Sequence, residues 1–150
     1  MYTIGVDFGT LSGRALLVDV RDGREVATAV FDYPHAVIDT VMPTTGKRLP
    51  PEWALQHPQD YLDVFAHTIP AVIAQSGVDP TEIVGIAVDF TASSPMPVKA
   101  DGTPLAFLDA FRDEPHAYVK LWKHHASQPQ ADLINEVARQ RHEGWLKRYG

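Results

Sequence analysis

The sequence predicts an α/β fold in which helices flank one mixed sheet. Three observations support this prediction. A tight turn at Asp22-Gly23 joins two β-prone segments, an amphipathic helical pattern begins at Pro58, and residues 83–88 form an almost uninterrupted apolar run. The chain therefore opens as a meander and continues with a helix and a further strand of the same sheet.

Composition limits the classes of partner. The 150 residues suffice for one globular domain. With 13 basic and 19 acidic side chains the net charge is −6, which argues against binding to nucleic acid or an anionic membrane surface. No apolar run approaches the ~20 residues of a membrane helix, and Asp7 and Arg14 interrupt the first apolar stretch too early for a signal peptide. The absence of cysteine excludes disulfides and thiolate metal sites, and is compatible with a cytoplasmic protein.

The first thirty residues predict a three-stranded antiparallel meander. Residues 2–6, 14–20 and 25–31 are apolar and β-prone. Asp22-Gly23 predicts a tight hairpin between the second and third strands, because both central positions of such a turn tolerate positive φ.

A long excursion and a helix follow. Residues 32–57 contain four prolines and no sustained periodicity, so we expect a surface loop with a short helix around 52–55. Pro58 suits the first position of a helix, Pro70 should kink that helix, and Gly77 should end it. The predicted buried stripe of the helix consists of Tyr61, Leu62, Phe65, Ile69, Val72 and Ile73.

The run at 83–88 resembles a strand that is covered on both faces. It ends in Asp89, and a polar loop of small residues follows at 91–94. Residues 98–105 predict a second hairpin around Asp101-Gly102.

The last third of the chain predicts one further helix. It starts near Pro129, with Ser127 as its N-cap. Its predicted buried face consists of Leu133, Ile134, Val137 and Ala138. Residues 143–150 contain Trp145 and Tyr149 without a terminating signal, and we expect exposed apolar surface there.

The constellation between residues 4 and 14 predicts a nucleotide-phosphate site on a hairpin. A strand delivers the carboxylate of Asp7 to the tip, where its natural partner is a magnesium ion that bridges phosphates. The phosphate-facing groups would be backbone N–H groups near Gly9 and Gly13, the hydroxyls of Thr10 and Ser12, and the guanidinium of Arg14. Neither a Walker loop nor a Rossmann glycine motif is present. In the alternative interpretation the glycines serve only the turn and Arg14 is solvated.

Residues 7–14 resemble the first phosphate motif of the FGGY carbohydrate kinases. Residues 84–93 resemble the strand and loop that touch the sugar in that family, and 120–125 resemble its tryptophan-containing segment. The resemblance extends from Ile4 to about Tyr149. It implies an actin/Hsp70-like (ribonuclease H-like) ATPase fold, ATP and magnesium as cofactors, a sugar as substrate, and allows a homodimer of the full-length enzyme.

Carried over residue by residue, the resemblance implies two groups of site residues. Asp7 matches the magnesium-associated aspartate, and Gly9, Thr10, Ser12 and Arg14 match the phosphate cradle. Thr91 and Ala92 match the pair that meets the substrate, and Trp122 matches the residue that lines the sugar pocket.

The same positions imply the substrate class. Thr91-Ala92 stands where glycerol kinases carry Arg-Glu and xylulose kinases commonly carry Met-His. The implied substrate is a ketopentose, L-ribulose in the first place, with a xylulose-type kinase as the alternative. Lys123, His124 and His125 depart from the family pattern and receive no catalytic role, and no spacing among the 7 histidines predicts a metal site.

Sugar phosphorylation needs a general base, and none of the aspartates of this chain matches the base of the resembled family. The family's base, second phosphate motif and adenosine-binding segment lie beyond residue 150. We therefore expect residues 1–150 to be the N-terminal part of the first domain of a kinase, without the second domain and inactive alone. Two other interpretations stay open: an actin-like nucleotide switch and a non-catalytic binding domain.

Overall fold

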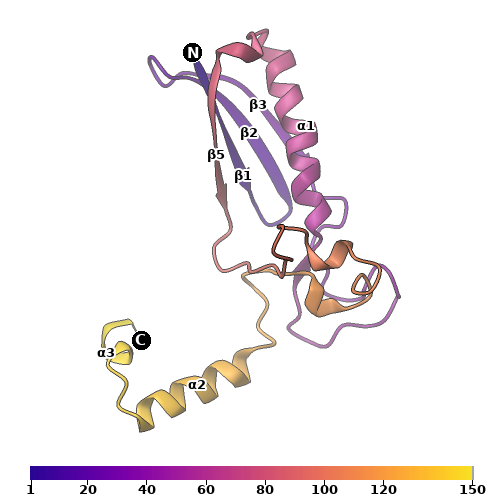
Figure 1. Cartoon of the computed structure of the whole chain (residues 1–150), viewed down its shortest axis with the longest axis vertical. Helices are drawn as coiled ribbons and strands as arrows, with labels where there is room; N and C mark the ends of the chain where they lie inside the picture. Colours follow the sequence, from indigo (N-terminus) through magenta and orange to yellow (C-terminus); the bar gives the residue numbers. More distant parts are fainter. Residues whose placement is uncertain (150) are drawn as a thin grey trace.

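A four-stranded mixed sheet with strand order β3-β2-β1-β5 lies at the centre of the structure. The computed structural model describes residues 1–149. β1 (Tyr2–Phe8), β2 (Ser12–Asp19) and β3 (Glu25–Asp32) form an antiparallel meander. β5 (Ile83–Phe90) returns beside β1 in parallel orientation (Figure 1). Both the predicted meander and the predicted mixed sheet are confirmed.

The predicted hairpin at Asp22-Gly23 is present. Gly23 has a φ of 74°, which glycine adopts without steric cost, and its N–H donates to the carbonyl of Asp19 at 2.9 Å. The buried carboxylate of Asp19 accepts hydrogen bonds from the side chain and the backbone of Arg21, which hold its pKa well below the usual range. This pairing closes the far end of the meander.

Helix α1 (Pro58–Ser76) covers one face of the sheet (Figure 1). It begins at Pro58 and ends at Gly77, whose φ is 65°, as predicted, and it continues through Pro70. Its buried residues are Pro58, Asp60, Val64, Thr68 and Val72. The predicted stripe is therefore wrong in part: Leu62 is exposed, because the buried row repeats every four residues from Asp60.

Gly13 allows α1 to approach β2 closely. A Cβ placed on Gly13 would lie 2.5 Å from Cγ2 and 2.7 Å from Cγ1 of Val64. Val64 is fully buried beside Ile4, Ala15 and Leu17 in the main core. The side chain that Gly13 lacks is thus replaced by one from the helix, and packing explains this glycine without reference to an anion.

The excursions on either side of α1 build a second, smaller core. β4 (Leu55–Gln56) pairs with β6 (Val119–Lys120), and Leu55 exchanges two backbone hydrogen bonds of 2.9 Å with Ile38. The short helix predicted at 52–55 is wrong because these backbone groups bond to distant segments instead. Six buried residues form this core: Ile38, Met42, Leu55, Ala106, Ala117 and Tyr118.

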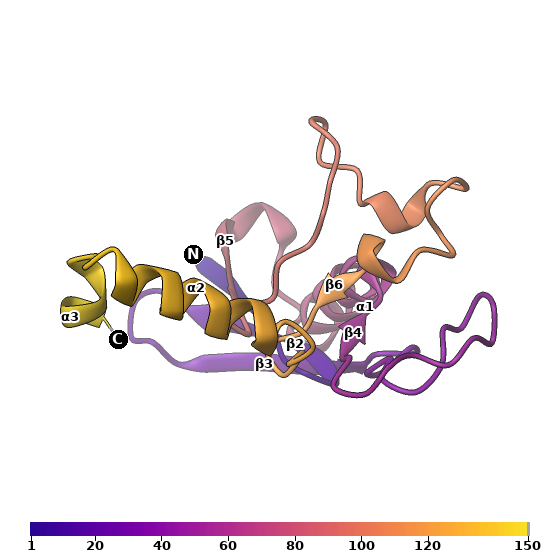
Figure 2. The same ribbon diagram turned by 90° about the horizontal axis from the view of Figure 1, so that it is seen from below.

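Residues 91–118 form the second excursion. Within it, Val98 bridges to Pro104 around Gly102, whose φ is 83°, so the second predicted hairpin is confirmed as a minimal one. Two single-turn 3₁₀ helices follow, at Leu105–Phe107 and Pro115–Ala117. Both excursions gather at the end of the sheet where β1 and β5 finish (Figures 1 and 2).

Besides the stripe of α1, the burial predicted for β5 and for the helix after Ser127 is wrong. The apolar side chains of β5 are exposed, with Val84 at 61% and Phe90 at 65%, because α1 packs mainly on β2 and β3 and leaves the face of β5 uncovered in the part of the chain that the structure describes. Helix α2 (Gln128–Gln140) starts after Ser127, but the Ser127 side chain makes no capping hydrogen bond.

The apolar face of α2 is partly exposed, since Ala138 is buried and Val137 half-buried. Leu133 and Ile134 are 62% and 60% exposed, because α2 lies away from the sheet, beside the short helix α3 (Trp145–Tyr149) (Figure 1). Trp145 and Tyr149 are exposed as predicted, and Gly150 lies outside the described residues. None of the helices described is both long and apolar enough to span a membrane.

Gly13→Ala is expected to destabilise the fold by about 1–3 kcal/mol, because the new methyl group overlaps Val64. Urea denaturation measures the change. Gly5→Ala in the adjacent strand is the matched control, since its Cβ would meet nothing within 4 Å. The double variant Gly13→Ala/Val64→Ala should lose less than the sum of the two single losses, and strict additivity would contradict the packing explanation.

Candidate functional site

Parallel pairing brings the ends of β1 and β5 together. Asp7 lies opposite Asp89 and Phe8 opposite Phe90, and the N–H of Thr91 donates to the carbonyl of Phe8 at 3.1 Å. The first residue of the predicted sugar loop is therefore bonded to the strand that carries the predicted magnesium aspartate. The structure brings together two motifs that are far apart in the sequence.

The polar face of this edge carries Asp7, Arg14 and Asp89. Asp7 and Arg14 are partners on adjacent strands, and Nε of Arg14 lies 3.4 Å from Oδ2 of Asp7. All three side chains line a shallow cavity of about 280 Å³. Two carboxylates against one guanidinium leave a net negative charge, and carboxylate oxygens are ligands that Mg²⁺ prefers. The donor set fits a magnesium ion better than a bare phosphate.

The opposite face of the same edge is apolar, because neighbouring residues of a strand point to opposite faces. A cavity of about 300 Å³ lies there between β5 and α1. Its lining consists of Phe8, Tyr61, Phe65, Val88, Phe90, Thr91 and Ser94. Phe8 contacts the edges of the Tyr61 and Phe65 rings at centroid distances of 5.5 and 5.2 Å. Thr91 is thus in a hollow that could accommodate a small molecule.

The loop between β1 and β2 is a tight turn. The N–H of Gly9 donates to the carbonyl of Ser12 at 2.9 Å, so in this conformation it is not directed to an anion. Ser12 opens β2, and Thr10 lies at the tip of the loop. The hydroxyls of Thr10 and Ser12 and the guanidinium of Arg14 are the donors at this tip.

Trp122 lies beside Thr10, 112 residues away in the sequence. The indole Nε1–H donates to Oγ1 of Thr10 at 3.2 Å, and the side chain is about half exposed. The Trp122 segment is held by Leu121, whose N–H donates to the carbonyl of Ala54 at 3.0 Å. A predicted phosphate residue and a predicted sugar residue therefore share a hydrogen bond.

The loop after Thr91 presents small groups. Ala92 is exposed, Ser93 has a φ of 58°, and the hydroxyls of Thr91 and Ser94 lie 3.3 Å apart. Ala92 has no polar side-chain group, so only its backbone could bond to a ligand.

Gln56 is a residue of this site that the sequence did not indicate. Its side chain is fully buried, and its amide nitrogen donates to the carbonyls of Thr10 at 2.8 Å and Gly9 at 3.4 Å. The Tyr61 hydroxyl donates to its amide oxygen at 2.6 Å. Burial raises the pKa of Tyr61 to about 12, so this hydroxyl keeps its proton. A single glutamine before a helix gives no pattern by which this role could be predicted.

His35, His57 and Asp60 form a cluster at the start of α1. Nδ1 of His35 lies 2.6 Å from Oδ1 of the buried Asp60, and the two imidazole rings stack at 4.1 Å with 14° between their planes. Their ligand atoms lie within 4.8 Å of one another, as a shared metal ion would require. However, the nitrogen lone pairs of two nearly parallel stacked rings point in similar directions and do not converge on one ion. In addition, Nδ1 of His57 already accepts the N–H of Gln59 at 3.1 Å. The cluster caps the helix.

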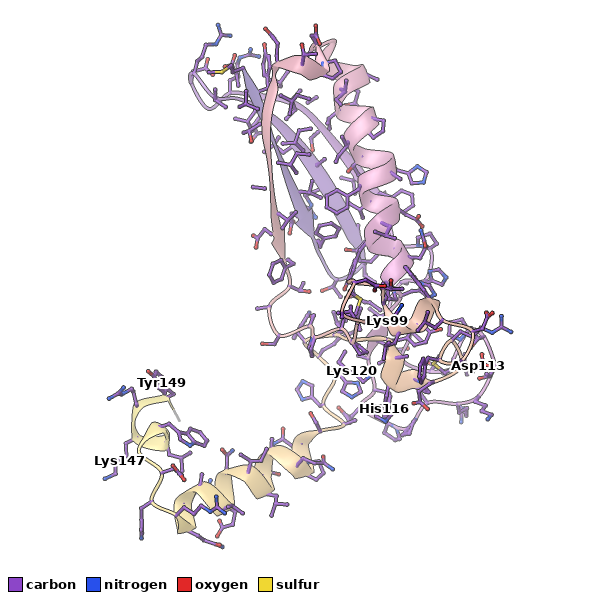
Figure 3. The ribbon with its side chains drawn as sticks, in the orientation of Figure 1. Lys99, Asp113, His116, Lys120, Lys147 and Tyr149 are labelled. Carbon is purple, nitrogen blue, oxygen red and sulfur yellow. The ribbon has the colours of Figure 1, made fainter. Side chains whose placement is uncertain are left out.

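The lysine and histidines near Trp122 hold the two excursions together. Nζ of Lys120 donates to the carbonyl of Pro115 at 2.8 Å and lies 5.4 Å from the Trp53 ring centroid; burial lowers its pKa to about 8. Nδ1 of His124 accepts the N–H of Ala54 at 3.1 Å. Lys120 and His116 lie together near the carboxyl end of the sheet (Figure 3). These contacts join the segment around Trp53 to the segment from Pro115 to His124.

Comparisons with known proteins identify relatives of the chain. Ribulokinases match almost the whole chain: those of Geobacillus thermodenitrificans and Halalkalibacterium halodurans are 52% and 53% identical over 149 residues, and that of Mycolicibacterium smegmatis is 54% identical over 150 residues. Each match covers 99% of this chain but only 26–27% of the relative. The chain thus spans about a quarter of the length of these relatives. No protein-family model matches it.

Solved structures give the same fold. A "xyloylose kinase" from Brucella ovis aligns with a TM-score of 0.70 and 20% identity, covering 95% of this chain and 25% of that one. A xylulose kinase from Rhodospirillum rubrum aligns with a TM-score of 0.64 and 20% identity, covering 91% and 23%. At this identity the likeness concerns the fold alone.

We predict that acid destabilises the start of α1 through His57. Burial, and then the neighbouring His35, lower the pKa of His57 below its ordinary 6.5. The folded state therefore favours neutral His57, and the associated stability is present above about pH 6.5 and lost as the pH falls through the lowered pKa. His57→Asn keeps an N-cap acceptor and removes the titration. Its Tm should fall less than the wild-type Tm between pH 7.5 and pH 5, and parallel curves would contradict the prediction.

Proposed function

We propose that the protein carrying this chain is an ATP-dependent kinase that converts L-ribulose to L-ribulose 5-phosphate, because the chain is homologous to the N-terminal quarter of ribulokinases. The observation that carries the proposal is identity above 50% to three ribulokinases over practically every residue of the chain. Residues 1–150 are then the N-terminal part of the first of two domains. The acidic, cysteine-free composition supports a cytoplasmic enzyme, and a homodimer is compatible with the family.

The residues at the tip of the β1–β2 hairpin would bind the phosphate groups of ATP. Mg²⁺, when bound, would neutralise charge on the nucleotide phosphates. Asp7, together with the in-register Asp89, would hold the ion through its hydration shell. The hydroxyls of Thr10 and Ser12 and the guanidinium of Arg14 would bind phosphate oxygens. Gly9 gives the turn its shape.

The loop after β5 would bind the sugar. Thr91 and the backbone of Ala92 would bond to sugar hydroxyls, and Trp122 would form one wall of the pocket. The small side chain of Ala92 leaves room for a ketopentose. Because Trp122 bonds to Thr10, the phosphate-binding and sugar-binding residues would be directly connected by a hydrogen bond. The general base and the remaining nucleotide contacts would come from residues beyond 150.

Asp7→Asn in the intact protein is expected to reduce kcat strongly while the Tm stays within a few degrees. Asp7 and Arg14 are both about half exposed, so their ion pair contributes little to stability. Arg14→Ala should weaken ATP binding by roughly 1.5–3 kcal/mol, the value of a lost charge-assisted contact.

Steady-state kinetics with ATP, magnesium and L-ribulose measure both effects. Arg24→Ala is the matched control, since Arg24 lies at the opposite end of the hairpin near Asp19. Wild-type kinetics in both site variants would contradict the phosphate site. A higher kcat/KM for D-xylulose than for L-ribulose would instead favour a xylulose-type kinase.

The 150-residue chain alone is expected to show no sugar kinase activity. It carries phosphate donors and one wall of a sugar pocket, but no group that matches the base. Positioning both substrates for reaction can lower the activation barrier by about 7–11 kcal/mol. A chain that forms only one side of the substrate cleft would lose most of this contribution. A coupled assay on the purified chain checks this, and repeated turnover above a protein-free control would show that the catalytic groups have been misplaced.

A further inference from the structure

Gln56 connects the loop after β1 to the start of α1 through a fully satisfied, buried amide. Its nitrogen donates to the carbonyls of Thr10 and Gly9, and its oxygen accepts the hydroxyl of Tyr61. The side chain is completely excluded from solvent. A buried amide that lost these partners would remain unsatisfied, so the loop and the helix are held in one relative position.

Chemistry determines which way the amide points. Backbone carbonyls only accept hydrogen bonds, so the NH₂ group must face Gly9 and Thr10. The amide oxygen must then face Tyr61, whose hydroxyl can donate. The reverse orientation would place the amide oxygen against two carbonyl oxygens, so the carbonyls of Gly9 and Thr10 select the orientation and the Tyr61 hydroxyl satisfies the amide oxygen.

Thr10 is held from two sides by segments that are themselves joined. Gln56 bonds to its carbonyl, and the indole of Trp122 bonds to its hydroxyl. Gln56 lies in β4, which pairs with β6, and Trp122 follows β6 by two residues. Gln56, Thr10 and Trp122 therefore belong to one ring of connected segments: hydrogen bonds join Gln56 to Thr10 and Thr10 to Trp122, and the β4–β6 pairing joins the segments of Gln56 and Trp122.

We propose that Gln56 is a positioning residue that holds Thr10 and the β1–β2 loop in the geometry that binds nucleotide phosphates. This inference rests on the proposed kinase function and deepens it. Gln56 itself touches no substrate. It acts through the backbone of Thr10, whose hydroxyl also accepts the indole N–H of Trp122.

The test uses three variants and one control in the intact protein. Gln56→Leu removes the polar amide at similar size, Gln56→Glu keeps the shape but removes the donors at neutral pH, and Tyr61→Phe removes only the partner of the amide oxygen. Gln59→Leu is the control, because the exposed side chain of Gln59 bonds to Asp63 on its own helix. Tyr61→Phe keeps the test decisive if the Gln56 variants fail to fold.

We expect both Gln56 variants to raise the KM for ATP about tenfold while kcat changes less than about threefold, and Tyr61→Phe to raise that KM by about threefold. Amide hydrogen exchange gives a readout that loss of stability alone would not produce. Exchange should increase selectively in residues 8–13, where the N–H of Gly9 bonds to Ser12, while α1 stays protected.

Unchanged ATP KM and unchanged loop exchange in the Gln56 variants would overturn the inference. An equal rise of exchange over the whole sheet and α1 would also overturn it, because Gln56 would then be a general stability residue. If the wild-type protein transfers no phosphate to any ketopentose, the proposed function fails. The exchange experiment still decides whether Gln56 positions the loop.

Discussion

The parallel pairing of β1 with β5 is the constraint on which the arrangement of the site depends. In-register parallel strands end at the same edge of a sheet. Asp7 therefore lies opposite Asp89, and directly after this pair the N–H of Thr91 bonds to the carbonyl of Phe8. Parallel strands need a long crossover, and the segment that contains α1 supplies it. Gly13 lets that helix lie close to β2, and its first turn is linked to the β1–β2 loop through the bonds from Tyr61 to Gln56 and from Gln56 to Thr10.

Polar contacts at the start of α1 complement this packing. Gln56 bonds to the loop, while His57 caps the helix and lies against His35, which is bonded to the buried Asp60. Buried polar groups are costly without partners, so each satisfied contact excludes alternative placements of the loop. Apolar burial holds the helix on the sheet, and these hydrogen bonds determine the position of the loop relative to both.

The wrong burial predictions share a physical cause. An uninterrupted apolar run identified β5 correctly as a strand, and capping and helical spacing identified α2 as a helix, yet both leave apolar side chains exposed, including Ile86 in β5 and Leu133 in α2. An apolar pattern reports which environment an element suits, but whether another element covers it depends on tertiary contacts. The helix stripe failed for a related reason, because Val64 rather than Leu62 faces Gly13.

The sequence by itself determined the meander, both ends of α1 and the motif that carries Asp7, because turn glycines, a first-turn proline and β-prone runs act locally through backbone sterics. It also indicated the residue types of a phosphate and a sugar site. Only the tertiary structure decided that Thr10 meets Trp122, that Gln56 holds the loop, and that residues near 55 form a strand. Hydrogen bonds across more than forty residues depend on how the excursions pack, and no local pattern encodes that geometry.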